Sequence, residues 1–121
     1  MQITQKNFYK KFLGRAGEVR AADFLKKKGY KILKKNYKTH LGEIDLIAKD
    51  GDTLVFVEVK TRISDDYGSP SEAVNFKKQE KYYKVATEYL VREKLMDSPC
   101  RFDVVEIENG QINHIFNAFG M

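Results

Sequence analysis

Two acidic residues and a lysine within Gly42–Lys60 have the types and spacing of a metal-dependent hydrolytic site. Asp45 precedes an Asp50-Gly51 turn, and Glu58 and Lys60 follow it. Successive side chains of a strand point to opposite faces, so Glu58 and Lys60 emerge on the same side. If the turn closes a hairpin, Asp45 comes within reach of that pair. The stretch then predicts a pocket of two carboxylates and one ammonium, and carboxylate oxygens are ligands that Mg²⁺ prefers.

Such a pocket suits hydrolysis of a phosphodiester, which needs a nucleophilic water and neutralised charge on the phosphoryl oxygens. We predict that Asp45 and Glu58 are metal ligands, together with the backbone carbonyl of Val59. Lys60 is expected to orient the attacking water and to stabilise the developing charge. Glu18 is predicted to complete the metal shell, either directly or through water.

Both acidic signals also have plain structural explanations. Glu58 and Lys60 could form only a salt bridge on an exposed strand, and Glu18 could pair with Arg15 or Arg20 at the edge of the core. The metal-site hypothesis depends on the combination, because the Glu-x-Lys triplet ends an apolar strand, follows Asp45 by a hairpin's length, and is preceded by a helical Glu. Glu43, close to Asp45 in the chain, is left outside the predicted site.

Periodicity predicts the element order α-β-β-β-α-β-β in one α/β domain spanning residues 1–121. A helical crossover makes the strand after the second helix parallel to the strand before it. Asn109-Gly110 predicts a two-residue hairpin at the end. We therefore expect a mixed central sheet flanked by helices. The predicted helices are Gln5–Lys28 and Phe76–Lys94, and the predicted strands are Tyr30–Tyr37, Gly42–Ala48, Thr53–Lys60, Arg101–Glu108 and Gln111–Phe116.

The strand Thr53–Lys60 is apolar on both faces until Glu58, which predicts a central strand covered on both sides. The polar segment Thr61–Ser71 follows it directly and contains Gly68 and Pro70. This is the longest loop that the chain offers and the element expected to be most mobile. It could form a flap over the pocket or be only a surface connection.

Charge is distributed unevenly along the chain. Its formal net charge is +5, but residues 1–40 carry +10 and residues 41–121 carry −5. A basic segment of this kind attracts polyanions, because Lys and Arg that neutralise phosphates release condensed counterions. We therefore predict a nucleic acid, specifically DNA, as partner; the alternatives are lysines that keep a helix soluble or guard a strand edge. The predicted DNA-binding residues are Lys10, Lys11, Arg15, Lys34, Lys35, Lys38 and Arg62.

The cysteine content and the length of the apolar runs indicate the cellular compartment of the protein. Cys100 is the only cysteine, so the chain forms no internal disulfide and a reducing cytoplasm fits best. The longest strongly apolar run, Leu54–Val57, is far shorter than the roughly 20 residues that cross a bilayer. We expect a cytoplasmic protein without a membrane segment.

The arrangement of these motifs resembles the PD-(D/E)XK nuclease superfamily, and within it the small bacterial YraN family of predicted endonucleases, which is similar to Holliday junction resolvases. The likeness covers most of the chain. The segments that carry it are Gly14–Glu18, Gly42–Ile47, Phe56–Arg62, Gly68–Pro70, Lys78-Gln79 and Arg101–Val105.

The resemblance implies a restriction-endonuclease-like core and Mg²⁺- or Mn²⁺-dependent hydrolysis of DNA, with branched or junction DNA as the expected substrate. It implies that Asp45, Glu58 and Lys60 carry the catalytic motif, with Glu18 as an auxiliary acid. Ile44 stands where the superfamily name has proline, a difference that does not affect the ligands.

Gln79 and Lys78 are expected to assist this site. Gln79 also forms a Gln-x-x-x-Tyr motif with Tyr83, which occurs beside the metal site in some relatives, although two residues one turn apart can equally be a simple helix-face pair. Two other functions stay open. The chain could be a nucleic-acid-binding module with weak or no catalysis, or it could pair through an exposed strand edge as a homodimer.

Overall fold

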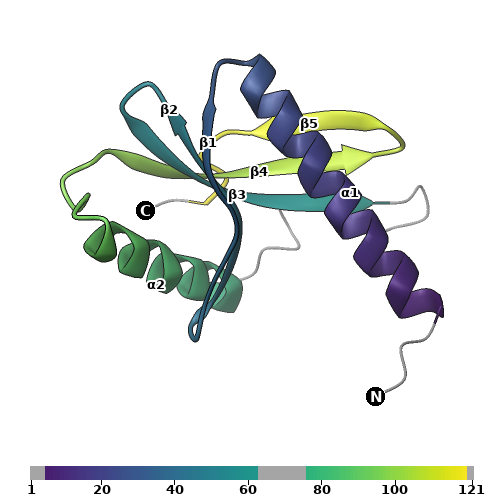
Figure 1. The fold of residues 1–121 in the computed structure, drawn as a ribbon, viewed down its shortest axis with the longest axis horizontal. Coiled ribbons are helices and arrows are strands. Elements are labelled where there is room, and N and C mark those ends of the chain that lie inside the picture. The colour runs from purple at the N-terminus through teal and green to yellow at the C-terminus, as the bar shows by residue number, and fades with distance from the viewer. Residues whose placement is uncertain (1–4, 63–75, 120–121) are drawn as a thin grey trace.

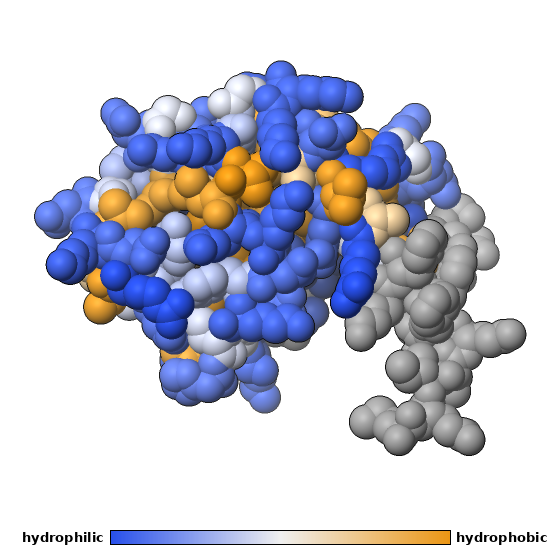
Figure 2. Space-filling view, viewed as in Figure 1, coloured by the Kyte–Doolittle hydropathy of each residue, from blue (hydrophilic) through white to orange (hydrophobic). Residues whose placement is uncertain are grey.

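Two helices lie on opposite faces of one five-stranded sheet (Figure 1). The computed structural model describes residues 5–62 and 76–119, with side chains described for 13–62 and 77–119. Neither described helix has an apolar stretch of the length that a bilayer crossing needs. Hydrophilic side chains cover most of one face, and a band of apolar side chains crosses it (Figure 2).

The predicted α/β class and element order are confirmed, and every boundary lies within two residues of its prediction. The helices are α1 (Gln5–Lys27) and α2 (Phe76–Arg92), and the strands are β1 (Lys31–Thr39), β2 (Gly42–Asp50), β3 (Thr53–Arg62), β4 (Cys100–Glu108) and β5 (Gln111–Ile115).

The strands lie in the order β1-β2-β3-β4-β5, and only β3 and β4 are parallel. This follows from α2, which connects these two strands as a crossover. Asn109 and Gly110 both have positive φ angles, of 50° and 82°, as a type I′ hairpin turn requires. The turn before β3 was predicted one residue too early: Asp50 pairs with Thr53, so the two turn residues are Gly51 and Asp52.

The first helix ends as its glycine predicts. Gly29 has a φ of 96°, and the amides of Gly29 and Tyr30 donate to the carbonyls of Lys26 and Leu25. These two bonds form a Schellman motif, which satisfies the last carbonyls of the helix. The chain thereby turns directly into β1, with Tyr30 and Leu25 both buried.

Each face of the sheet has its own core. Ala21, Ala22 and Leu25 of α1 pack with Val55 and Val57 on one face. On the other face, Val85, Ala86, Tyr89 and Leu90 of α2 pack with Leu54 and Phe56. The alternation of β3 is therefore as predicted, and Glu58 lies two residues beyond Phe56, at the α2 side.

Some predictions fall on residues that the structure does not describe. Thr61 and Arg62 end β3, and residues 63–71 of the predicted loop lie outside the described ranges. Lys10 and Lys11 belong to α1, but their side chains are outside the described part.

Candidate active site

Strands β2 and β3 separate where Asp45 and Glu58 face each other. Their ladder runs from Asp50–Thr53 to Leu46–Val57 and ends there. At the next position the backbone amide of Val59 donates a 2.8 Å hydrogen bond to Oδ2 of Asp45. A carboxylate therefore takes the place that a main-chain carbonyl would hold in a continuing ladder.

The side-chain alternation of β2 breaks at the same point. Leu46 packs on the α1 side, yet Ile44, two residues away, packs on the α2 side. On the adjacent strand β1, Asn36 has a φ of 52°, a left-handed conformation that asparagine tolerates better than most residues. These irregularities distort both strands around Asp45 and account for its carboxylate lying between strands rather than on one face.

Asp45 and Glu58 form a close carboxyl pair. Burial, the charge of Glu58 and a hydrogen bond between the two side chains raise the pKa of Asp45 to about 8, although the Val59 amide opposes the shift. The negative charge of Glu58 so close to Asp45 makes ionisation of Asp45 unfavourable. The Glu58 side chain is only 12% exposed, so water does little to relieve this repulsion.

Lys60 supplies the positive charge that the sequence predicts. Its Nζ lies 3.2 Å from Oε1 of Glu58, with its side chain 21% exposed. Lys78 of α2 lies close to Lys60, and the Lys60 charge and partial burial lower the pKa of Lys78. The predicted auxiliary Lys78 therefore lies at the pocket, and Gln79 beside it is half-buried.

Glu18 approaches the pair from α1. Burial and the charges of Glu43 and Glu58 raise its pKa, while a hydrogen bond with Asn36 and the charge of Arg15 lower it. The predicted Arg15 partner is thus a contributor to the Glu18 environment, and Asn36 is the side chain that holds the carboxyl group.

Gly17 allows α1 to come this close. A methyl group at position 17 would collide with Oγ1 of Thr61, whereas Gly14 has open space around it. The Thr61 hydroxyl is buried and has no hydrogen-bond partner among the described residues. The contact between Gly17 and Thr61 sets the distance between α1 and β3, and it thereby positions the neighbouring Glu18 near the carboxyl pair.

Sequence reasoning missed three residues at this site. Tyr82 hydrogen-bonds to Glu58, and its burial and that carboxylate raise the Tyr82 pKa. Asn36 binds Glu18, as described above. Glu43 was left outside, yet its charge acts on both Glu18 and Tyr82. A signal for Glu43 was available, because residues two apart on a strand share a face, and Glu43 is two residues before Asp45.

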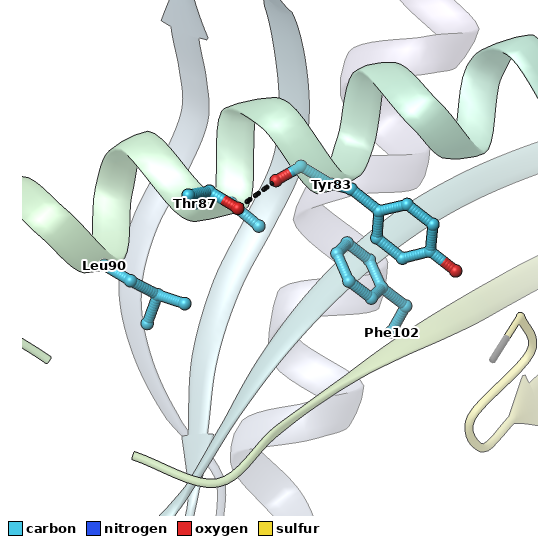
Figure 3. A pocket seen from close by; sticks show the side chains of 5 residues that line it. Tyr83, Thr87, Leu90 and Phe102 are labelled. Atoms are coloured by element: carbon cyan, nitrogen blue, oxygen red, sulfur yellow. Dashed lines mark hydrogen bonds between the residues drawn. The ribbon is translucent and has the colours of Figure 1, made fainter. Parts of the chain in front are cut away.

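Tyr83 lines an apolar hollow of about 270 Å³ together with Ala86, Thr87, Leu90 and Phe102, and none of these described lining residues is acidic (Figure 3). Its ring meets that of Phe102 edge-on with centroids 5.2 Å apart. The Gln-x-x-x-Tyr motif therefore does not act as a unit here, and its tyrosine is a core residue.

The predicted DNA-binding residues do not form one surface. Cross-strand partners share a face of the sheet. Lys34 pairs with Ile47, which packs on the α2 side, while Lys35 pairs with Leu46 on the α1 side. Lys34, Lys35 and Lys38 are all exposed, as is Arg15 of α1, and Arg62 is half-buried at the end of β3.

The donor set suits a hard divalent cation, since it consists of carboxylate oxygens in a partly buried pocket with a surplus of negative charge. Burial and the charge of Glu58 raise the pKa of Asp45, and a bound cation would neutralise the excess negative charge. Within residues 5–62 and 76–119, however, no three His, Cys, Asp or Glu side chains converge closely enough to hold a metal ion. The pair Asp45 and Glu58 fits the predicted metal, and Glu18 is near it without joining it.

Comparison with known proteins gives the family to which this chain belongs. The family model described as "Uncharacterised protein family UPF0102" matches residues 17–107. The chain belongs to the UPF0102 family. UPF0102 proteins of Thermodesulfovibrio yellowstonii and Clostridioides difficile are 51% and 48% identical to it, each over 88% of this chain and 95% of their own length. A UPF0102 protein of Caldanaerobacter subterraneus is 48% identical over 94% of this chain and 99% of its own length.

The UPF0102 match spans Glu18, Asp45, Glu58, Lys60 and Lys78 together. It also includes Arg101 and Asp103 of a second polar cluster, in which the Asp103 side chain is fully buried in β4. Asp103 accepts hydrogen bonds from Nε of Arg101 at 3.1 Å and from the amide of Asn117 at 2.9 Å, and its Oδ2 lies 2.7 Å from Nε2 of His114. These partners lower the Asp103 pKa despite its burial. The cluster ties β4 to β5 and to Asn117, which follows β5.

Proposed function

We propose that this UPF0102 protein is a metal-dependent endonuclease that hydrolyses DNA phosphodiester bonds, a member of the YraN-like branch of the PD-(D/E)XK nucleases. The observation that carries the proposal is the carboxyl pair at the separated ends of β2 and β3, with Lys60 ion-paired to Glu58 at 3.2 Å. Branched or junction DNA is the proposed substrate on family analogy.

Asp45 and Glu58 would hold Mg²⁺ or Mn²⁺, with the Val59 carbonyl as a further oxygen donor and Glu18 contributing through a water. When bound, the metal would lower the pKa of a water and neutralise charge on the phosphoryl oxygens. The Val59 amide fixes the orientation of Asp45, and Tyr82 does the same for Glu58. Lys60 donates hydrogen bonds at the edge of the pocket, where it can orient the nucleophile and stabilise negative charge on the phosphate.

The test is cleavage of a panel of labelled DNAs: single-stranded, linear duplex, flapped and four-way. The purified protein should nick at least one of them with Mg²⁺ or Mn²⁺ and none in EDTA. Glu58→Gln and Lys60→Ala should abolish nicking while leaving the circular dichroism spectrum unchanged. If neither metal supports cleavage of any of these DNAs, the proposal fails.

A second function is a DNA-binding module without useful catalysis. It is favoured by one observation, namely that no third acidic, His or Cys side chain in the described part of the chain joins Asp45 and Glu58. DNA binding that EDTA and Asp45→Asn leave unchanged, without cleavage, would select this alternative.

A further inference from the structure

The flank of α2 that faces the start of β2 carries a run of exposed lysines. Lys77, Lys81 and Lys84 recur at spacings of four and three, and Lys78 lies three residues before Lys81. Residues at these spacings are neighbours on one side of a helix. Glu80 borders the run next to Lys84, so the positive potential is strongest at Lys78 and Lys81.

These two lysines lead to the carboxyl pair. Lys78 lies close enough to Lys60 for the Lys60 charge to lower the Lys78 pKa, and Lys60 is ion-paired to Glu58. Lys81 packs beside Gly42, the first residue of β2 and three positions before Asp45. Lys60, Lys78 and Lys81 are called the lysine surface below.

The lysine surface is electrostatically costly in the free protein. The positive charge of Lys60 and partial burial lower the Lys78 pKa, whereas the nearby Glu58 and Asp45 carboxyls act in the opposite direction. Lys78 also lies in the first turn of α2, which has no acidic residue, although the positive end of a helix dipole disfavours cations there. A solubilising lysine has no need of either position. A phosphate would relieve both costs, because it binds ammonium groups and is favoured at this end of a helix.

We propose that Lys60, Lys78 and Lys81 form a phosphate-binding surface that holds the DNA backbone on the α2 side of the carboxyl pair. This inference rests on the proposed function and specifies the direction from which its substrate approaches. It assigns to α2 a binding role in addition to that predicted for residues of α1 and β1 and for Arg62. The contacts are with phosphates, so they position the DNA without reading its sequence.

The test is duplex DNA binding by fluorescence anisotropy in EDTA, over a range of salt concentrations. Lys78→Ala/Lys81→Ala is compared with the matched control Lys31→Ala/Lys49→Ala, which removes two exposed lysines paired at the far end of β1 and β2. At about 0.1 M salt the first variant should lose roughly eightfold in affinity for each phosphate contact, and the slope of log K against log salt should fall by about 1 per contact. The control should keep the wild-type slope, and Lys78→Arg should retain both slope and affinity.

The inference is overturned if Lys78→Ala/Lys81→Ala binds like the control, or if the folded wild-type protein does not bind DNA. Thermal unfolding of each variant shows that a loss of binding is not a loss of fold. The outcome is independent of catalysis. A reduced slope in a protein that cleaves no DNA would support the lysine surface and reject the nuclease, whereas normal cleavage with an unchanged slope would do the reverse.

Discussion

The backbone amide of Val59 donates a 2.8 Å hydrogen bond to Oδ2 of Asp45, so a side chain rather than a main-chain carbonyl ends the β2–β3 ladder. This bond has two effects. It gives a hydrogen-bond acceptor to the Val59 amide, which would otherwise have none because the strands separate there. It also holds Asp45 beside Glu58 in spite of their electrostatic repulsion. The distortion of the sheet and the clustering of charge thus have the same origin.

Asp45→Asn should stabilise the metal-free protein at neutral to alkaline pH. The Asp45 pKa is raised from 3.8 to about 8, so between these values the folded state binds more protons than the unfolded state, and stability falls as pH rises. Asparagine removes that penalty and keeps an acceptor for the Val59 amide. Urea unfolding in EDTA should show a gain on the order of 1–2 kcal/mol at about pH 8 and less at about pH 5. A variant less stable than wild type at both values would contradict the assignment.

Mn²⁺ should raise the melting temperature of the wild-type protein more at about pH 8 than at about pH 6. The reason is that Asp45 must lose its proton before a cation can bind, and burial and the Glu58 charge raise the Asp45 pKa to about 8. Stabilisation by a ligand grows with its concentration over its dissociation constant, so a titration at each pH gives the two affinities. Asp45→Asn is the control and should lose the shift. Equal shifts at both pH values, or a shift that survives in the variant, would contradict a site at this pair.

Gly17→Ala should destabilise the protein, whereas Gly14→Ala should stabilise it. Both glycines lie in α1, where alanine is the better helix former by up to about 1 kcal/mol. Only at Gly17 would the new methyl group meet Oγ1 of Thr61, and overpacking of this kind costs about 1–3 kcal/mol. Chemical denaturation of both variants measures the contrast. Adding Thr61→Ala to Gly17→Ala should restore most of the loss; if both single variants are stabilised, α1 does not depend on this contact.

Much of the fold could be predicted because its signals are local. Gly29 ends α1, Asn109-Gly110 closes the last hairpin, and α2 as a crossover makes β4 parallel to β3. Each depends on a few consecutive residues or on a general rule of chain handedness. The alternation of β3 likewise placed Glu58 and Lys60 on the correct face, and the hairpin placed Asp45 opposite.

The other features of the site could not be predicted, because they depend on strand distortions and long-range contacts that the periodicity of the sequence does not indicate. The break in alternation at Ile44 and the left-handed Asn36 have no local signal strong enough to predict them. Tyr82 and Tyr83 are adjacent in sequence, yet one reaches Glu58 and the other packs on Phe102, because a helix turns by about 100° per residue. Without the position of the helix axis over the sheet, the sequence did not single out Tyr82.

Asp103→Asn should cost about 3 kcal/mol or more of stability, because it removes the charge that faces Arg101 and His114 in the protein interior. Asp97→Asn, at an exposed position after α2, is the control and should change little. The native partners lower the Asp103 pKa below its usual 3.8, so its contribution should be present above that value and lost as pH falls below it. Urea unfolding at about pH 7 and in the acid range measures both effects. A loss equal to that of Asp97→Asn would show that the cluster does not stabilise the fold.

Tyr82→Phe should weaken metal binding more than it weakens the fold. The hydroxyl hydrogen-bonds to Glu58, while the ring is stacked with Phe119 at a centroid distance of 5.8 Å, and phenylalanine keeps the second contact. The loss of one hydrogen bond costs about 1 kcal/mol of stability. Partners that orient a ligating group typically contribute 10- to 100-fold in metal affinity, so roughly that loss is expected in a Mn²⁺ titration by calorimetry. Tyr83→Phe is the matched control, because its ring packs on Phe102 away from the carboxyl pair, and it should leave the affinity unchanged. Equal affinities for the two variants would mean that Glu58 keeps its position without Tyr82.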